Sequence, residues 1–320
     1  MVVIIGAGPI GLATAIELKK RGIKSRIIER GCLVNSIFNY PTNMTFFSTS
    51  DKLEIGNIPF ISHGDKPTRQ EALEYYRRAA EHYDLDVRLY EEVTALKGSD
   101  GNFEVETVKE THKAEKVVLS TGFYGQENRM NIPGEDLPKV THYYDEPHKY
   151  AWQNVLVVGA GNSAADAALE TYRCNAKVSM LVRERELKPS IKYWVKPDIE
   201  NRIKEGSIDA YFNSELLEIR EKEVVIKTEE GLKTIENDFV LAMTGYHPHF
   251  GLMETMGIDL SKDEIKMPVF NENSLETNRK GLYVAGVVCG GMDTSSLFIE
   301  NTRVHAEHIA GHVEGGLKIN

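Results

Sequence analysis

The sequence predicts an α/β fold with two Rossmann-like dinucleotide-binding domains. A glycine-rich motif follows a short apolar run at residue 6 and again at residue 159, and each motif precedes a stretch with helical periodicity. A strand, a glycine turn and a helix in this order form a dinucleotide-binding unit. After each unit in the sequence come three segments in which apolar and polar residues alternate, which predict a β-meander and lead to a Thr-Gly pair. The same arrangement occurs twice, so we expect two bound nucleotides.

The first motif is Gly6-x-Gly8-x-x-Gly11. It lies between the apolar run 2–5 and a helix-like run over 9–21, and a second apolar run ends at Glu29. Glycines make the turn tight and let backbone amides approach a pyrophosphate, while an acid at the next strand end accepts hydrogen bonds from an adenosine ribose. Glu29 stands close to the expected spacing of about 20 residues. This context favours a nucleotide site over an ordinary tight turn.

The second motif, Gly159-x-Gly161-x-x-Ala164, ends differently. Its second apolar run reaches Val182, where the first unit has its acid, and arginines follow at 183 and 185. Guanidinium groups bind a 2′-phosphate through paired, charge-assisted hydrogen bonds, whereas an acid repels it. We therefore expect NADPH rather than NADH here. The alternative is that both arginines are solvated charges at a strand end.

The remaining segments complete the two copies. A loop-rich stretch, 31–66, leads into a helix-like run over 68–83 that opens with the capping pair Thr68 and Glu71. A linker at 131–147 precedes the second copy. The predicted meanders cover 87–97, 102–108 and 113–119, then 216–220, 223–228 and 232–242, and they lead to Thr121-Gly122 and Thr244-Gly245. A short buried strand at 281–286 and a helical run over 297–313 predict a return to the first domain.

Composition limits the partners. The formal net charge is −10 without a long basic run, which argues against nucleic acid and anionic membranes as partners. Three cysteines give no pattern of structural disulfides, and no apolar run approaches the roughly 20 residues that cross a bilayer. We therefore expect a cytoplasmic protein.

At full length the chain resembles the thioredoxin-reductase type of flavoprotein, which has the same order of motifs. More specifically it resembles the bacillithiol disulfide reductases, which lack the CxxC motif and pass electrons from NADPH through FAD to a small disulfide. The matching stretches are Asn39-Tyr40-Pro41-Thr42, the run 46–56, the run 242–248 and Phe298-Ile299-Glu300-Asn301. The resemblance implies an FAD-binding domain at 1–123 and 245–320, an NADPH-binding domain at 124–244, and a homodimer or larger assembly.

The motifs and the resemblance together imply specific cofactor contacts. For FAD these are Gly6, Gly8, Pro9, Gly11, Glu29, Arg30, Tyr40, Thr42, Ser48, Val93, Thr121, Gly122, Gly286 and Ile299. For NADPH they are Gly159, Gly161, Asn162, Ser163, Ala164, Arg183, Arg185 and Thr244.

Three departures from the related families concern the redox chemistry. Where thioredoxin reductases place CxxC, this chain has His142-Tyr143-Tyr144-Asp145. Many bacillithiol disulfide reductases carry a cysteine inside the first glycine motif, and Ile10 occupies that position, which excludes chemistry through that thiol. Val287 replaces the aspartate that binds the ribityl chain in many related flavoproteins, so backbone amides must hold that part of FAD.

The catalytic residue is therefore unknown from the sequence. Cys289 is the best-placed of the three thiols, because it precedes the last predicted helix, although a free cysteine is more often a small buried hydrophobe. His247 and His249 are either close to the nicotinamide and substrate or ordinary loop residues. Histidines at 305, 308 and 312 share a helix face without a further ligand, so no metal site is expected.

Three acceptors of the electrons remain open. Bacillithiol disulfide or a similar small disulfide is favoured by the resemblance and disfavoured by Ile10. A protein carrier such as ferredoxin is the second, since NADP reductases of this fold also lack CxxC, although the net acidity of the chain speaks against it. The third is a redox-sensing binding protein in which turnover is incidental.

Overall fold

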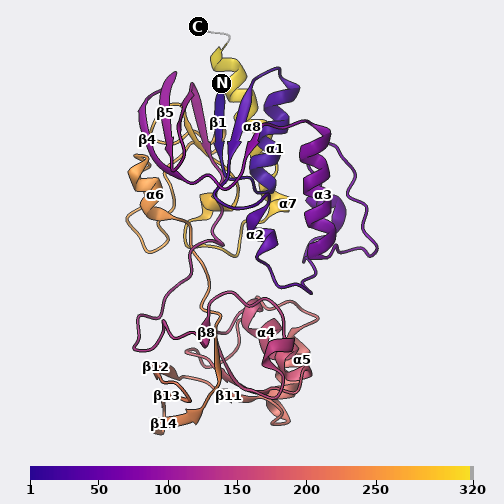
Figure 1. Cartoon of the computed structure of the whole chain (residues 1–320), viewed down its shortest axis with the longest axis vertical. Helices are drawn as coiled ribbons and strands as arrows, with labels where there is room; N and C mark the ends of the chain where they lie inside the picture. The colour runs from indigo at the N-terminus through magenta and orange to yellow at the C-terminus, as the bar shows by residue number, and fades with distance from the viewer. Residues whose placement is uncertain (318–320) are drawn as a thin grey trace. The chain divides into compact units, whose positions relative to one another are not determined.

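The computed structural model describes residues 1–317 and divides into two compact units (Figure 1). The first unit contains Met1–Asn39, Met44–Gln126 and the chain from Tyr246 onward, and the second contains Tyr40–Asn43 and Glu127–Gly245. These boundaries lie within a few residues of those expected from the sequence. The segment Tyr40–Asn43 differs: it was expected in the first domain but packs with the second unit, where the Thr42 amide donates to the Asp145 carbonyl oxygen at 2.8 Å.

A parallel five-stranded sheet forms the centre of the first unit. Its order is β16-β7-β1-β2-β3, and its strands are β1 (Val2–Ile5), β2 (Ser25–Ile28), β3 (Val87–Arg88), β7 (Lys116–Leu119) and β16 (Leu282–Val284). All four residues of β1 are buried, because a central parallel strand is covered on both faces and is apolar throughout. The helix α1 (Pro9–Lys20) connects β1 to β2 and buries most of its residues.

The other elements of the first unit surround this sheet. The meander β4 (Val93–Ser99), β5 (Asn102–Thr107) and β6 (Thr111–Ala114) forms a separate antiparallel sheet. The capping box predicted for Thr68 and Glu71 is confirmed at the start of α3 (Arg69–His82). The remaining elements are α2 (Asn35–Phe38), η1 (Ser50–Leu53), α6 (Phe250–Thr255), η3 (Gly286–Gly290), α7 (Ile299–Thr302) and α8 (His305–Leu317).

The second unit repeats the plan. Its parallel sheet has the order β11-β10-β9-β15-β8, and its meander is β12-β13-β14. The strands are β8 (Val140–Thr141), β9 (Asn154–Val158), β10 (Lys177–Leu181), β11 (Asp209–Tyr211), β12 (Glu215–Ile219), β13 (Glu223–Thr228), β14 (Gly231–Glu236) and β15 (Phe239–Ala242). The helices are η2 (His148–Tyr150), α4 (Asn162–Arg173) and α5 (Lys196–Lys204). The predicted fold of two Rossmann-like domains, each with a meander, is confirmed.

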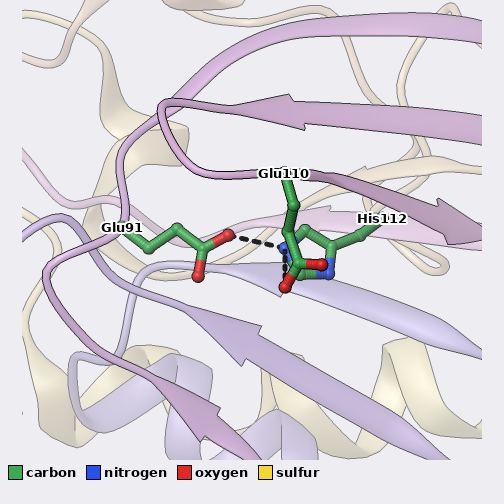
Figure 2. Close-up of side chains that lie close together, drawn as sticks. All are labelled: Glu91, Glu110 and His112. Carbon is green, nitrogen blue, oxygen red and sulfur yellow. Dashed lines mark hydrogen bonds and ion pairs between the residues drawn. The ribbon is translucent and has the colours of Figure 1, made fainter.

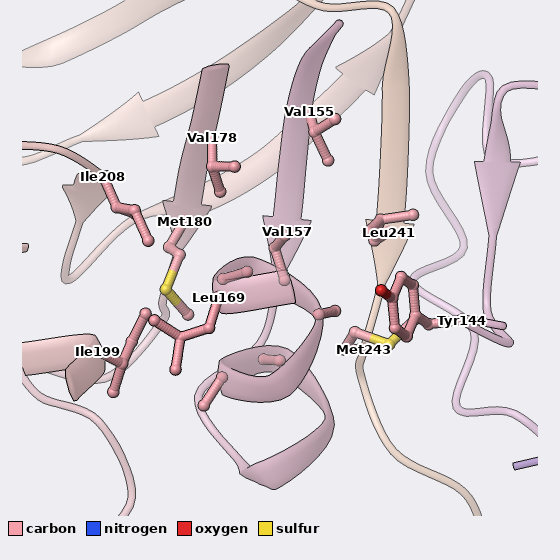
Figure 3. Close-up of a cluster of buried hydrophobic side chains, with 14 of the residues drawn as sticks. Tyr144, Val155, Val157, Leu169, Val178, Met180, Ile199, Ile208, Leu241 and Met243 are labelled. Carbon is pink, nitrogen blue, oxygen red and sulfur yellow. The ribbon is translucent and has the colours of Figure 1, made fainter. Parts of the chain in front are cut away.

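Figure 3 shows the core between this sheet and α4. Val157 and Met180 come from the central strands and are fully buried, and they face Leu169 of α4. Ile199 of α5 extends the same cluster. The four alanines of α4, at 164, 165, 167 and 168, are buried as well. Small side chains on this face let the helix approach the sheet and place its N-terminus beside the glycine turn.

Three predicted strands are each two strands in the structure. The segments expected at 113–119 and 232–242 break at Glu115 and at Asn237–Asp238, so that one half closes the meander and the other enters the parallel sheet. The segment expected at 87–97 divides into β3 and β4 in the same way. At the second break the buried Asn237 side chain donates to the Phe239 carbonyl oxygen at 2.7 Å. This hydrogen bond stabilises the bend between the two strands.

The helix predicted over 297–313 is also interrupted. It forms α7 and α8 with a turn at Arg303 and Val304, and the Arg303 guanidinium donates to the carbonyl oxygens of Asp51 and Glu54. These bonds tie the turn to η1 and its C-terminal cap. Among residues 1–317, no helix combines the length and apolar character that a membrane span requires.

Candidate cofactor-binding sites

The first glycine turn leaves space at one of its three glycines. Gly6 has φ +109°, and a Cβ there would lie 2.6 Å from the Ser120 carbonyl oxygen, while a Cβ at Gly11 would lie 2.0 Å from the carbonyl oxygen of Gly6. Gly8 differs, since its φ is −73° and a Cβ added there would have no atom of the described residues within 4 Å. Neither backbone nor neighbours require glycine at this position. The open space lies at the N-terminus of α1, where an anion is stabilised.

Glu29 is held in a fixed orientation at the end of β2. Its Oε2 accepts from the Ala7 amide at 2.9 Å and its Oε1 accepts from the Gly31 amide at 2.8 Å. The side chain is buried, yet each carboxylate oxygen keeps a further lone pair. The residue can therefore accept hydrogen bonds from ribose hydroxyls while the backbone fixes its position.

A pocket in the first unit opens beside Glu29. Six of the predicted FAD contacts line it, namely Gly6, Glu29, Arg30, Val93, Thr121 and Gly122. Residues that the sequence did not indicate as cofactor contacts complete the wall: Ile5, Ile28, Glu91, Glu92, Phe123, Gly125, Gln126, His247, His249 and Leu252. The two histidines are the main surprise. They were expected near the nicotinamide or in an ordinary loop, and the structure brings them to the pocket that contains Glu29.

Glu91 supports one wall of this pocket through a buried network (Figure 2). Its Oε1 accepts from His112 Nε2 at 2.6 Å and from the Thr107 hydroxyl at 2.8 Å, and Arg26 donates to His112 Nδ1 at 3.3 Å. Burial disfavours the charged carboxylate, but the hydrogen bonds outweigh this and lower the pKa of Glu91. The network fixes the turn that runs from Glu91 into β4.

The same cluster has the composition of a metal site, because the exposed Glu110 lies 3.9 Å from His112 Nε2. The hydrogen bonds argue otherwise. A guanidinium only donates, so His112 Nδ1 accepts and the proton is on Nε2, where it is directed at Glu91. Metal ligation requires a free lone pair on that nitrogen. We interpret the three side chains as structural.

Gly286, at the end of β16, packs directly against α1. It has φ +83°, and a Cβ there would lie 3.1 Å from Cγ1 of Ile10, which is itself buried. Its amide donates to His305 Nδ1 at 3.1 Å. Burial lowers the pKa of His305 to about 4, in keeping with a neutral ring that accepts this bond. His305 thus orients the backbone in which Val287 replaces the usual aspartate, a role that the sequence did not reveal.

The same bond predicts a pH dependence. The folded-state pKa of His305 lies below its unfolded value of 6.5, so the unfolded chain binds more protons between about pH 6.5 and 4 and stability falls as the pH is lowered through this window. Measured by urea unfolding, the free energy of unfolding of His305→Asn should fall less steeply with decreasing pH than that of the wild type. The amide oxygen of asparagine still accepts the hydrogen bond but does not titrate. His82→Asn, at an exposed position on α3, is the control, because His308 itself contributes to the lowered pKa of His305. Equal slopes for all three proteins would contradict the assignment.

Cys289 does not have the properties of an activated thiol. It is 2% exposed and belongs to a core cluster with Val284 and Met253, and burial raises its pKa to about 12. His305 Nδ1 lies 4.0 Å from its sulfur but already accepts the Gly286 amide. A reactive cysteine has a lowered pKa and some exposure, so the structure speaks against the catalytic interpretation.

Eight predicted FAD contacts do not line this pocket: Gly8, Pro9 and Gly11 at the start of α1, Gly286 after β16, and four residues elsewhere in the chain. Tyr40 and Thr42 belong to the second unit, as described above. Ser48 is half-buried ahead of η1, and Ile299 is half-buried at the start of the short helix α7. Their contacts with a flavin remain predictions.

The second glycine turn repeats the geometry of the first. Gly159 has φ +138°, and a Cβ there would lie 2.4 Å from the Met243 carbonyl oxygen and 3.3 Å from Cβ of Ala164. Gly161 precedes α4 with φ −101°, and no atom of the described residues lies within 4 Å of a Cβ. In this turn too, the glycine that the packing of the described residues does not require stands at a helix N-terminus.

Two predicted NADPH contacts have roles within the protein. Asn162 holds the loop after β10, since its Nδ2 donates to the Ser190 carbonyl oxygen at 3.1 Å and its Oδ1 accepts from the Lys192 amide at 2.9 Å. The Thr244 hydroxyl donates to the Asn128 carbonyl oxygen at 2.6 Å. Ser163 is exposed in the first turn of α4 and remains available to a ligand.

Arg183 and Arg185 follow β10 and are both exposed. In the described part of the chain neither guanidinium forms an ion pair or a side-chain hydrogen bond. Most other arginines of the second unit are paired with carboxylates, as Arg220 is with Glu218 and Glu223. Two guanidinium groups that are unpaired within residues 1–317, and that one residue separates shortly after β10, can bind a 2′-phosphate.

Comparisons with known proteins agree with this geometry. The family model for pyridine nucleotide-disulphide oxidoreductases matches residues 3–286. The chain is 45% identical over 313 residues to bacilliredoxin reductase Bdr of Bacillus subtilis, covering 97% of this chain and 96% of that protein. The bacillithiol disulfide reductase Bdr (YpdA) of Bacillus cereus has a TM-score of 0.96 at 42% identity over 99% of both chains, and that of Staphylococcus aureus 0.95 at 42% over 98% of both.

More distant structures share the fold alone. A thioredoxin reductase of Lactococcus lactis superposes with a TM-score of 0.79 at 19% identity, covering 100% of this chain and 99% of that chain. The pyridine nucleotide-disulphide oxidoreductase family uses FAD and NAD(P)H, in agreement with the expected cofactors. The resemblance to the bacillithiol disulfide reductases is confirmed as well: this chain belongs to the pyridine nucleotide-disulphide oxidoreductase family and, within it, to the Bdr flavoproteins.

Proposed function

We propose that this protein binds FAD at the glycine turn of the first unit and NADPH at that of the second, and reduces bacillithiol disulfide or a related small disulfide. The names of the similar proteins from B. cereus and S. aureus support the substrate. The observation that best supports the two cofactor positions is the pair Gly8 and Gly161. Each is a glycine that no φ angle and no neighbour of the described chain requires, and each begins the first helix of a Rossmann unit.

Charge distinguishes the two positions. Glu29, fixed by two backbone amides, suits ribose hydroxyls and repels a 2′-phosphate. Arg183 and Arg185 are exposed and unpaired within residues 1–317, and they suit that phosphate. We therefore assign NADPH to the second unit and FAD to the first.

The chain's contribution to the reaction is placement and electrostatics. When bound, FAD would supply the redox centre that couples oxidation of NADPH to two-electron reduction of the disulfide, with one proton taken up from solvent to give two thiols. Gly8 and the N-terminus of α1 hold the pyrophosphate, and Gly286, oriented by His305, offers its backbone to the ribityl region. Ile10 fills the position at which relatives carry a thiol, so reduction proceeds without a protein disulfide there.

Replacing Cys289 tests this view of the chemistry. The Cys289→Ala variant should keep kcat within about twofold, while losing on the order of 1 kcal/mol of unfolding free energy because a buried side chain becomes smaller. Steady-state NADPH oxidation with bacillithiol disulfide and urea unfolding measure the two effects. The exposed fraction of Cys174 is larger, so Cys174→Ala is the matched control. A loss of turnover of a hundredfold or more, specific to position 289, would restore the catalytic interpretation.

The decisive measurement is anaerobic NADPH oxidation by the purified yellow protein, with and without bacillithiol disulfide. We expect strong stimulation by the disulfide. Stoichiometric flavin reduction without stimulation would instead favour a protein acceptor.

A protein acceptor is the second candidate, and specific observations favour it. The B. subtilis relative is named a bacilliredoxin reductase, and ferredoxin–NADP reductase 2 of Bacillus thuringiensis is 28% identical over 301 residues, covering 90% of this chain and 84% of that protein. The absence of a thiol at Ile10 also fits electron transfer to an external redox group. Adding a reducible ferredoxin or bacilliredoxin to the same anaerobic assay distinguishes the candidates.

We further propose that the protein is cytoplasmic and forms a homodimer or larger homo-oligomer. The resemblance of the sequence to thioredoxin-reductase-type flavoproteins implies the assembly, and the net charge of −10 supports a protein without nucleic-acid or anionic-membrane partners. Light scattering at several protein concentrations tests the assembly, and a constant monomer mass would contradict it.

A further inference from the structure

Two histidines line the first-unit pocket with Glu29, and neither belongs to the glycine motif. His247 and His249 follow the second Thr-Gly pair, more than two hundred residues after the turn that they join in space. Their role rests on the proposed binding of FAD in this unit. If Glu29 holds the adenosine ribose, the base attached to that ribose lies within reach of the same pocket walls.

One ring nitrogen of His247 already has a hydrogen-bond partner within the protein. Its Nδ1 lies 2.7 Å from the Pro248 carbonyl oxygen, and because a carbonyl only accepts, Nδ1 carries the proton. The ring stacks on Phe250 with centroids 5.6 Å apart and planes 5° from parallel, and the backbone amide donates to the Gln126 carbonyl oxygen at 2.9 Å. In the neutral ring Nε2 is therefore an acceptor, and no described residue donates to it.

His249 has the opposite polarity. Its Nδ1 accepts from the Leu252 amide at 3.0 Å, where the side chain caps α6. The proton of the neutral ring is therefore on Nε2, which becomes a donor. Both residues line the pocket, and their backbone contacts fix opposite tautomers, so that Nε2 is an acceptor in one neutral ring and a donor in the other.

We propose that His247 and His249 recognise the adenine base of the dinucleotide in the first unit, His247 Nε2 accepting from the exocyclic amino group and His249 Nε2 donating to an adjacent ring nitrogen. Adenine carries an amino donor next to ring-nitrogen acceptors, which is the complement of this pair. Hypoxanthine, in which an oxygen replaces the amino group and the neighbouring N1 is protonated, presents the reverse pattern. The site therefore selects an adenine dinucleotide by its base as well as by its ribose.

The test uses the full-length apoprotein and measures flavin affinity by fluorescence, without reference to turnover. Wild type is titrated with FAD, with FAD deaminated to its hypoxanthine analogue, and with FMN, which has no adenosine. His247→Phe keeps a ring on Phe250 and removes the acceptor. His249→Asn keeps a side chain that can cap α6, but it is shorter and removes the Nε2 donor of the imidazole. His82→Phe, at an exposed position on α3 away from the pocket, is the control.

We expect wild type to prefer FAD over the deaminated analogue by at least tenfold. Each pocket variant should weaken FAD binding by about tenfold, the size of one lost hydrogen bond in a partly buried site, and the double variant should bind FAD and the analogue equally. FMN affinity should stay unchanged in all variants. An unaltered preference for FAD in the double variant would overturn the inference. A wild type that binds neither FAD nor FMN would contradict the proposed function instead.

Discussion

Replacing Arg183 and Arg185 together by alanine should raise the KM for NADPH about a hundredfold and leave the KM for NADH within about threefold. Each guanidinium is exposed and, within residues 1–317, has no carboxylate to release before it binds a phosphate. A charge-assisted hydrogen bond contributes about 1.5 kcal/mol or more, and two such losses correspond to a factor of about 100. Steady-state kinetics with both nucleotides measure the effect.

The control is Arg220→Ala in the same unit, because this exposed arginine is already paired with Glu218 and Glu223 and should leave both KM values unchanged. Replacing both arginines with lysine should recover part of the preference, since lysine keeps the charge but loses the paired geometry. Equal increases for NADPH and NADH would show that the arginines do not recognise the 2′-phosphate.

The sequence was sufficient for the turns because their requirements are local. Gly11 and Glu29 are set by contacts within one βαβ unit and Gly6 by its positive φ angle, and the central strand of each parallel sheet is an apolar run of four or five residues. The breaks at Glu115 and Asn237 were not predictable from periodicity. In both places an alternating strand continues directly into a buried parallel one, and only the sheet to which each half belongs distinguishes them.

The pocket could not be predicted in full for a different reason. Glu91, Gln126 and His247 come from three separate stretches of the chain and meet only in the folded unit. The two histidines carried a visible signal, since they directly follow a Thr-Gly pair, but their distance from the first motif along the chain hid the site. Cys289 shows the converse: the sequence indicates its place shortly after Gly286, but its burial depends on core residues such as Met253 that the local sequence does not indicate.

A side chain at Gly8 should abolish FAD retention without harming the fold. Gly8→Val places its Cβ where no atom of the described residues lies within 4 Å, at a φ of −73° that valine tolerates. We expect the unfolding free energy to change by no more than about 1 kcal/mol, the scale of helix-capping preferences. FAD affinity should fall by at least a hundredfold, because the side chain occupies the pyrophosphate space. The flavin absorbance of the purified variant and its urea midpoint measure the two effects.

Gly11→Ala is the matched substitution, because it separates packing from cofactor binding. Alanine in the first turns of α1 should favour the helix by about 1 kcal/mol on propensity alone. Its Cβ, however, would lie 2.0 Å from the Gly6 carbonyl oxygen, so the helix must move away from the turn and the apoprotein should lose several kcal/mol of stability. We expect the Gly8→Val variant to be a stable protein without flavin and the Gly11→Ala variant to be unstable. This pair of results would mean that the first motif serves two purposes: Gly11 lets α1 approach β1, and Gly8 leaves room for the nucleotide. A Gly8→Val protein that is purified yellow and fully loaded would contradict the placement of FAD in the first unit.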